Sequence, residues 1–311
     1  MSAAWSGQVG IAFAAGGERL VAWYAGILAG LAAASAEQGE PFDGRRAGAL
    51  VGTSAGAWAA LQLAAGVDME ACARRLEARG GGAADAKRGA ADAKRGADLF
   101  ELMAQAYAAT PGTPRERRRA LAAIALERSP GGEEAFVAAA AARLPTERWP
   151  APLRIAALDA LSGERVSWGA ADGVPLARAL AAARSVPLLR PPVTIDGRPR
   201  IDGALASATS ADLLSGVELA VVVTGSPADA APGSVDAHWN AALDDELARL
   251  DAAGVRAHVL RADAADRVAI GPDPMSALTA PLAVRAGRRR GRELAILLRA
   301  QRASAQLSGR R

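Results

Sequence analysis

The chain has 311 residues, of which 51% are hydrophobic and 4% aromatic, and its formal net charge is +4 at pH 7. This length can bury a large core, and the composition excludes a disordered chain. No window holds about 20 uninterrupted apolar residues, so we expect no membrane span. The first residues lack the basic segment of a secretory signal. The excess of arginine could favour anionic lipid surfaces or acidic substrates, and we expect no nucleic-acid partner.

Cysteine usage limits the chemistry further. Cys72 is the only cysteine, so the chain forms no internal disulfide and has no cysteine cluster for zinc. A reducing, cytoplasmic setting fits this composition. We expect neither a metal nor a cofactor.

The first predicted element is an apolar strand at 9–14, followed by Gly16, Gly17 and a helical pattern over 21–36. A strand, a glycine turn and a helix form the first half of a βα unit. Backbone N–H groups at this turn could face an anion, either a phosphate or an oxyanion. A plain tight turn explains the two glycines equally well. A phosphate loop is disfavoured because no Gly-Lys-Ser/Thr follows.

The next βα unit carries the sequence Gly52-Thr53-Ser54-Ala55-Gly56 between an apolar run and an alanine-rich helical segment. Strand, sharp turn with serine at its apex, and helix make the context of a nucleophile elbow. Glycines at 52 and 56 would relieve crowding around the strained turn. The following helix would point its free N–H groups toward the serine oxygen. The pentapeptide by itself occurs by chance in a glycine-rich chain.

The middle of the chain contains a simple duplication. Residues 82–88 and 89–95 have the same seven letters, without the apolar positions of a coiled coil. We therefore expect a low-complexity, flexible insertion near 80–97 within a single domain over 1–311. Helices are predicted at 67–79, 99–107, 115–127 and 133–144. The last three would form a cap or side layer over whatever the elbow binds.

The second half of the chain returns to alternating strands and helices. The predicted strands are 153–158, 164–168, 193–195, 200–201, 219–223 and 255–260, and the predicted helices are 175–184, 238–253 and 281–302. An Asp-Gly turn closes the hairpin around 196–197, and that hairpin leads into Asp202-Gly203. This alternation predicts a three-layer α/β/α sandwich with a mainly parallel central sheet.

The glycine turn, the serine elbow and the Asp-Gly after the hairpin together resemble the bacterial members of the patatin-like phospholipase family. The resemblance includes the runs 184–187, 191–193 and 201–204 and the tail 271–275. The similarity covers most of the chain, the duplicated stretch being the main part outside it. It implies a patatin-like fold and a serine acyl hydrolase that cleaves lipid or other carboxylic esters, in the manner of phospholipase A or a lysophospholipase.

Carried over to this chain, the resemblance makes Ser54 the nucleophile and Asp202 its general base. Serine needs an adjacent base, and an aspartate becomes a useful base only where burial raises its pKa. Gly203 completes the Asp-Gly motif, although an Asp-Gly pair alone is also an ordinary turn. The oxyanion hole would consist of the backbone N–H groups of Gly16, Gly17 and Glu18.

The oxyanion loop departs from the family's G-G-G-x-R/K-G pattern. Glu18 stands where a third glycine is usual, the basic residue Arg19 comes one place early, and Leu20 follows it. Glu18 can offer its N–H only if its backbone conformation is not reserved for glycine, and its carboxylate must turn outward or pair with Arg19. A family member with a drifted loop could instead act mainly as a lipid- or acyl-binding protein.

A Ser-His-Asp α/β-hydrolase is the other alternative, with His238 or His258 as the third member. Neither histidine lies in a glycine-rich loop, and the elbow comes after only one βα unit, too early for that fold. A structural role for both histidines is therefore favoured.

The closing helix carries a basic cluster, which could contact an anionic membrane peripherally. Its members are Arg285, Arg288, Arg289, Arg290 and Arg292. A solvated helix face explains the same cluster and is the favoured interpretation.

Overall fold

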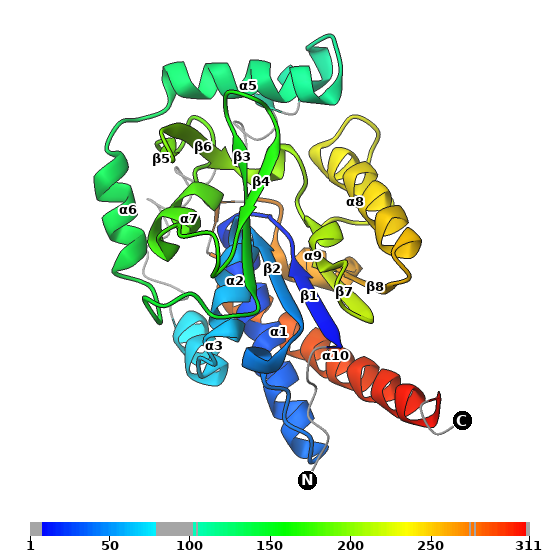
Figure 1. Ribbon diagram of the computed structural model, residues 1–311. Helices are drawn as coiled ribbons and strands as arrows, with labels where there is room; N and C mark the ends of the chain where they lie inside the picture. Colours follow the sequence, from blue (N-terminus) through cyan, green and yellow to red (C-terminus); the bar gives the residue numbers. More distant parts are fainter. Residues whose placement is uncertain (1–7, 79–101, 104, 274, 277, 309–311) are drawn as a thin grey trace.

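The computed structural model describes residues 8–78, 102–103, 105–273, 275–276 and 278–308 (Figure 1). The predicted insertion near 80–97 lies outside these described residues. The strands are β1 (Val9–Phe13), β2 (Ala49–Thr53), β3 (Leu153–Asp159), β4 (Arg165–Trp168), β5 (Val193–Ile195), β6 (Arg198–Asp202), β7 (Leu219–Thr224) and β8 (Arg256–Arg261). The helices are α1 (Glu18–Glu37), α2 (Ala55–Ala64), α3 (Met69–Ala78), α5 (Pro114–Arg128), α6 (Glu133–Ala141), α7 (Leu176–Ala183), α8 (Val235–Ala252), α9 (Ala264–Ile270) and α10 (Ala280–Ser308).

The strands form one sheet in the order β5-β6-β3-β2-β1-β7-β8, with β4 paired to β3 outside this path. The pairs β3–β2, β2–β1, β1–β7 and β7–β8 are parallel, whereas β4, β6 and β5 join in antiparallel pairs. The predicted fold class is confirmed as an α/β fold with a mixed, mostly parallel central sheet flanked by helices.

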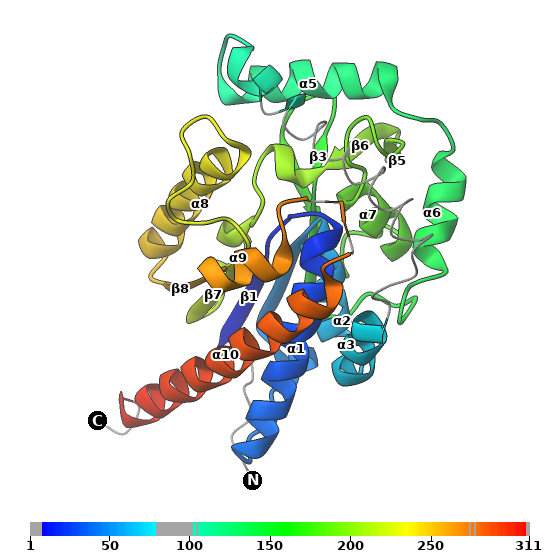
Figure 2. The same ribbon diagram turned by 180° about the vertical axis from the view of Figure 1, so that it is seen from behind.

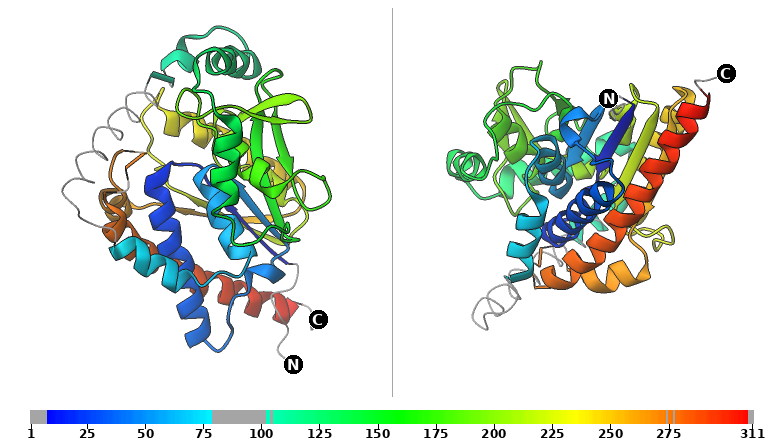
Figure 3. Two further views of the ribbon diagram at one scale, coloured as in Figure 1. Left: turned by 90° about the vertical axis from the view of Figure 1, so that its left-hand side faces the viewer. Right: turned by 90° about the horizontal axis from the view of Figure 1, so that it is seen from below.

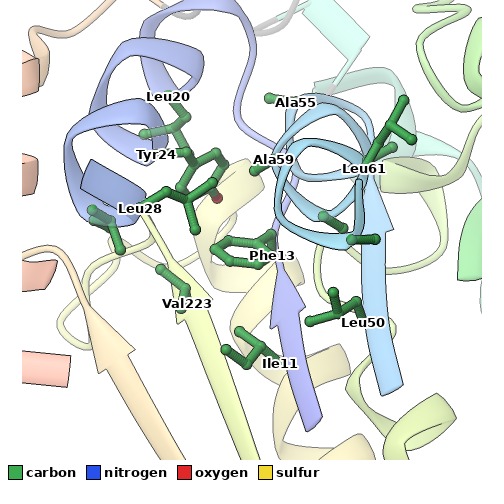
Figure 4. Close-up of a cluster of buried hydrophobic side chains, with 14 of the residues drawn as sticks. Ile11, Phe13, Leu20, Tyr24, Leu28, Leu50, Ala55, Ala59, Leu61 and Val223 are labelled. Carbon is green, nitrogen blue, oxygen red and sulfur yellow. The ribbon is translucent and has the colours of Figure 1, made fainter. Parts of the chain in front are cut away.

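Alternating side chains of the buried strands supply two cores. Ile11 and Phe13 of β1 face α1, α2 and α10, whereas Ala12 between them joins the core beneath α8. Figure 2 shows α1, α2 and α10 in front of the sheet, and Figure 4 shows Phe13 between β1 and the two helices α1 and α2. Helices therefore cover both faces of the sheet.

Helices α1 and α10 pack unusually close together, as the two views in Figure 3 show. A Cβ added to Gly30 would lie 2.2 Å from the Arg288 carbonyl oxygen, and one added to Gly287 would lie 2.1 Å from the Trp23 carbonyl oxygen. Glycine at these positions lets one backbone approach the other. This contact was not predicted from the sequence, although glycine at 26, 30, 287 and 291 gives each helix a spacing of four.

Helix α1 differs from the sequence prediction in two ways. It begins at Glu18, three residues earlier than the predicted start, because Gly17 ends the preceding turn with a φ of 77°. Within the described part of the chain it is also the one helix long and apolar enough to cross a membrane by length and composition. However, 72% of that apolar window is buried inside the fold, as in a core helix.

Helix α5 covers the end of the sheet where β3 and β4 meet (Figure 1). Thr113 and Glu116 form a capping box at its start. The guanidinium groups of Arg115 and Arg118 donate hydrogen bonds to the carbonyl oxygens of Ser162 and Gly163 in the β3–β4 turn, at 3.0 and 2.7 Å. These bonds fix α5 beside the cavity described below.

Candidate active site

Ser54 occupies a sharp turn between β2 and α2, with φ 54° and ψ −118°. A positive φ is uncommon for a residue with a side chain and costs about 1–3 kcal/mol. Two glycines make this turn possible. A Cβ on Gly56 would lie 1.9 Å from the Phe13 carbonyl oxygen, and one on Gly52 would lie 2.4 Å from the Gly56 carbonyl oxygen. The geometry is that of a nucleophile elbow, with Ser54 6% exposed.

The register of the sheet brings Asp202 to the same place. Thr53 at the end of β2 pairs with Ala156 of β3, and the next residue of β3, Ala157, pairs with Asp202 at the end of β6. The Ser54 hydroxyl lies beside the Asp202 carboxylate and, as a potential hydrogen-bond donor, lowers the pKa of that carboxyl against the effect of burial. Two residues far apart in the sequence therefore meet across neighbouring strands.

Asp202 is 3% exposed and is held by backbone contacts on both sides. Its N–H donates to the Ser185 carbonyl oxygen at 3.0 Å, and its Oδ1 accepts from the Ala204 N–H at 2.9 Å. Burial raises the pKa of Asp202 to about 6, while the bonds from Ser54 and Ala204 and the charge of Arg184 oppose that rise. This carboxylate is a stronger base than an exposed aspartate.

The glycine turn lies beside Ser54. The N–H groups of Ala14 and Ala15 donate hydrogen bonds to the carbonyl oxygens of Val223 and Ala208, at 3.0 and 2.8 Å. Gly16 and Gly17, the next two residues, line the same cavity as Ser54. Glycine is required at 17 by its positive φ, and a Cβ at 16 would lie 2.1 Å from Leu20 Cδ1.

Two helices begin at this cavity. Glu18 is the first residue of α1 and Ala55 the first residue of α2, so their N–H groups belong to first turns without intrahelical partners. Figure 4 shows α1 and α2 side by side, with Leu20 and Ala55 near their starts. Glu18 has no positive φ, so its backbone conformation is not one reserved for glycine. The positive ends of two helix dipoles therefore converge near Ser54.

The carboxylate of Glu18 does not pair with Arg19, one of the two arrangements expected from the sequence. It accepts a hydrogen bond from Arg184 Nη2 at 2.6 Å. The Arg19 guanidinium instead donates to the carbonyl oxygens of Gly271 and Pro272, at 2.9 and 2.7 Å. Sequence adjacency suggested the wrong partner because consecutive helical residues point in different directions.

The site opens into a cavity of about 330 Å³, within the size range of small-molecule sites. Its described lining residues are Ala15, Gly16, Gly17, Ser54, Met103, Tyr107, Ala108, Arg117, Val186, Pro187, Asp202, Ala204, Leu205, Gly233, Ser234, Val235, Ala237, His238 and Trp239. Most are apolar or small. Among them Arg117 is the only arginine or lysine and Asp202 the only carboxylate.

The helices predicted at 99–107 and 115–127 were expected to cover the elbow, and Tyr107 and Arg117 from these segments line the cavity, whereas the wall formed by α8 was not predicted from the sequence. Trp239 Nε1 donates to the Ala204 carbonyl oxygen at 2.8 Å, which fixes the turn after Asp202. The rings of Tyr107 and His238 contact each other at a tilt of 48° with centroids 4.5 Å apart, and the Arg117 guanidinium lies 5.8 Å from the Tyr107 ring centroid. No local motif marks these residues, because only the tertiary packing turns them toward Ser54.

The two histidines occupy different places. His238 lines the cavity, but its Nε2 is 3.3 Å from the Leu205 carbonyl oxygen, and burial lowers its pKa. His258 lies in β8, which is separated from β2 by β7 and β1. The Ser54 hydroxyl and the Asp202 carboxylate lie beside each other, and neither histidine has a hydrogen bond to either group in the described part of the chain.

Most of the basic cluster on α10 is engaged in ion pairs. Arg288 pairs with Glu70 and Glu77, Arg289 with Asp263, Asp266 and Glu293, Arg290 with Asp266 and Glu293, and Arg292 with Glu37. Arg285 is exposed and has no ion pair within the described ranges. No group of three metal-ligating side chains is found in the described part of the chain.

The fold and this site define an α/β protein with a serine elbow, a buried aspartate and a glycine turn around one apolar cavity. The family model described as patatin-like phospholipase matches residues 11–215, so the chain belongs to the patatin-like phospholipase family. No curated protein matches the chain in sequence.

Several solved structures resemble the chain, and VipD and ExoU are two of them. VipD from Legionella pneumophila has 15% sequence identity and a TM-score of 0.34, over 76% of this chain and 53% of that chain. The type III effector protein ExoU has 14% identity and a TM-score of 0.40, over 94% of this chain and 53% of that chain. The chain thus spans about half the length of each of these proteins.

Proposed function

We propose that the protein hydrolyses lipid acyl esters through a Ser54–Asp202 dyad and an acyl-serine intermediate. The observation that carries the proposal is the placement of the strained Ser54 hydroxyl beside a buried carboxylate, Asp202, whose pKa burial raises to about 6. Near neutral pH such a carboxylate is deprotonated and still basic enough to accept the serine proton.

In the proposed reaction Asp202 takes the Ser54 proton as Oγ attacks the ester carbonyl carbon. The carbonyl oxygen becomes an oxyanion, and collapse of the tetrahedral intermediate expels the alcohol, which takes the proton from Asp202. A water molecule, deprotonated by Asp202, then attacks the acyl-serine, and Ser54 regains its proton as the fatty acid leaves. Asp202 accepts and returns the proton in both half-reactions, and water is the second nucleophile.

The oxyanion is assigned to the backbone N–H groups of Gly16, Gly17 and Glu18. Gly16 and Gly17 line the cavity beside Ser54, and Glu18 begins α1. Such donors act where charge develops, and removal of one typically lowers kcat by about 10²–10³.

We infer a phospholipid or lysophospholipid as the substrate class from the cavity lining. Apolar residues such as Met103, Val186 and Trp239 suit an acyl chain, and Arg117 offers a cation to a phosphate. Arg117 Nε donates to the Gly112 carbonyl oxygen at 3.1 Å, and no described carboxylate pairs with Arg117. The two terminal nitrogens of its guanidinium can therefore face a headgroup.

Few unpaired cations on α10 are available for peripheral contact with an anionic membrane. Carboxylates pair with Arg288, Arg289, Arg290 and Arg292, so that Arg285 is the exposed cation of the cluster that has no ion pair within the described residues. We expect vesicle co-sedimentation to respond little to anionic lipid content, and a strong salt-sensitive response lost in Arg285→Ala would establish contact through this face.

The test is covalent labelling with a fluorophosphonate probe, followed by an activity panel of phospholipid, lysophospholipid and p-nitrophenyl esters. Wild type should be labelled at Ser54 and turn over at least one ester, and Ser54→Ala should do neither. Arg117→Met should lose activity on phosphate-bearing esters and retain it on neutral ones. Absence of both labelling and turnover in wild type would reject the hydrolase, and acyl-chain binding in that case would favour a binding protein.

A further inference from the structure

One ion pair joins the two halves of the candidate active site. Glu18, at the start of α1, accepts from Arg184, which follows the last residue of α7, at 2.6 Å. The two residues are 166 positions apart, and their side chains are 38% and 25% exposed. The pair therefore lies at the edge of the fold rather than in its core.

Each partner is covalently close to a different part of the site. The residue before Glu18 is Gly17, which lines the cavity beside Ser54. The residue after Arg184 is Ser185, whose carbonyl oxygen accepts the Asp202 N–H at 3.0 Å, and Ser185 Oγ is itself fixed by a 2.6 Å bond to the Pro191 carbonyl oxygen. A displacement of either partner would be transmitted to the glycine turn or to Asp202.

The charges matter as well as the geometry. An unpaired Glu18 carboxylate beside the proposed oxyanion donors would oppose a second negative charge there. Arg184 balances that carboxylate, and its charge also lowers the pKa of Asp202 against the effect of burial. Among the described residues, the other charged or titratable side chains that line the cavity with Asp202 are Tyr107, Arg117 and His238, and Arg200 on β6 pairs with Asp159 of β3.

We propose that Glu18 and Arg184 are a positioning pair, which holds the glycine turn against the Asp202 loop and cancels the charge that Glu18 brings to the oxyanion site. The inference rests on the proposed hydrolase function. It explains how this chain accommodates a glutamate where the family pattern has glycine.

The test compares Arg184→Met, Glu18→Gln and the double variant with wild type, in kcat, KM and the pH profile of kcat/KM. Arg184→Met leaves Glu18 unbalanced, so kcat at neutral pH should fall about 10- to 100-fold with KM changed much less. The acidic limb of the kcat/KM profile of Arg184→Met should move to higher pH, because loss of the positive charge raises the pKa of Asp202. Glu18→Gln in the Arg184→Met background should restore part of kcat.

Arg178→Met is the matched control. Arg178 lies on α7, pairs with Glu133 at 2.8 Å, and both side chains are 27% exposed, yet neither residue lines the cavity. This variant should keep the wild-type kcat and pH profile. Loss of kcat in Arg178→Met equal to that in Arg184→Met, or additive effects in the double variant, would overturn the pair's role.

A second readout does not depend on turnover. The pKa of Asp202 can be followed by NMR of labelled aspartate carboxyls, with Asp202→Asn to assign the signal. An unchanged Asp202 pKa in Arg184→Met overturns the inference even in an active enzyme. A wild type without labelling or turnover rejects the proposed function, whereas an active wild type with an unaffected Arg184→Met variant rejects only the positioning pair.

Discussion

The Ser54 hydroxyl lies beside the Asp202 carboxylate and lowers its pKa against the effect of burial, and the two residues are 6% and 3% exposed. The backbone of Ser54 has an unfavourable conformation at this turn, with φ 54°. The Asp202 carboxyl is buried, and this burial raises its pKa to about 6. Both features cost folding free energy at the place where the chemistry is proposed, and both costs can be measured.

Replacement of Ser54 by glycine should remove backbone strain as well as the hydroxyl. Ser54→Gly and Ser54→Ala should both be inactive, but Ser54→Gly should be more stable than Ser54→Ala by about 1 kcal/mol in urea unfolding, since glycine adopts positive φ freely. The same two substitutions at Ser35, inside α1, are the control. Ser35→Gly should be less stable than Ser35→Ala, because glycine has a lower helix propensity than alanine. The same order at both positions would contradict the strain argument.

The pH dependence of activity should follow Asp202. Because the base must be deprotonated, kcat/KM should fall as pH drops below about 6. The contribution of Asp202 to the free energy of unfolding should change in the opposite direction and increase as the pH falls. The folded-state pKa lies above the ordinary 3.8, so this carboxyl favours the folded state below about pH 4, and that contribution is lost as pH rises through 6.

Replacement of Asp202 by asparagine tests the raised pKa of Asp202 through stability, without an activity measurement. Asp202→Asn should be more stable than wild type at pH 8 by up to about 3 kcal/mol, and this advantage should disappear near pH 4. Thermal unfolding at the two pH values measures the difference. An equal difference at both values would show that burial does not raise the pKa of Asp202.

The histidines should be dispensable for the chemical step. His238→Asn and His258→Asn, alone or combined, should keep kcat within about tenfold of wild type, since loss of a true general base costs about 10²–10⁴. A change in KM is expected for His238→Asn alone, because His238, unlike His258, lines the cavity. If the double variant instead lost activity by about a thousandfold or more, a Ser-His-Asp triad would be favoured.

Gly56 should tolerate no side chain. The added methyl group of Gly56→Ala would lie 1.9 Å from the Phe13 carbonyl oxygen, so β1 and α2 would have to separate. We expect a loss of about 3 kcal/mol or more in the free energy of unfolding. Gly131→Ala is the control, because its added methyl group would meet nothing within 4 Å, and it should be nearly neutral.

The contact of α1 with α10 predicts a reversal of helix propensity. Alanine normally stabilises a helix by about 1 kcal/mol relative to glycine. Gly30→Ala and Gly287→Ala should nevertheless destabilise the protein, because each methyl group would overlap the facing backbone. Ala32→Gly on the exposed side of α1 should lose about 1 kcal/mol and shows the ordinary propensity. Stabilisation by Gly30→Ala would contradict the close approach.

The sequence by itself determined the local pieces of this protein. The alternation of apolar runs with helical segments predicted the α/β sheet, and the short motifs at 16–17, 52–56 and 202–203 predicted the glycine turn, the elbow and the Asp-Gly turn. These features depend on the conformational limits of neighbouring residues, and such limits are written in the sequence itself.

Only the tertiary structure decided which distant groups meet. The pairing of Glu18 with Arg184, the cavity walls formed by Tyr107, His238 and Trp239, and the contact of α1 with α10 join residues far apart in the chain. Strand register set the approach of Asp202 to Ser54. Such contacts depend on how complete elements pack, and the free energy of that packing is a property of the whole fold rather than of any local pattern.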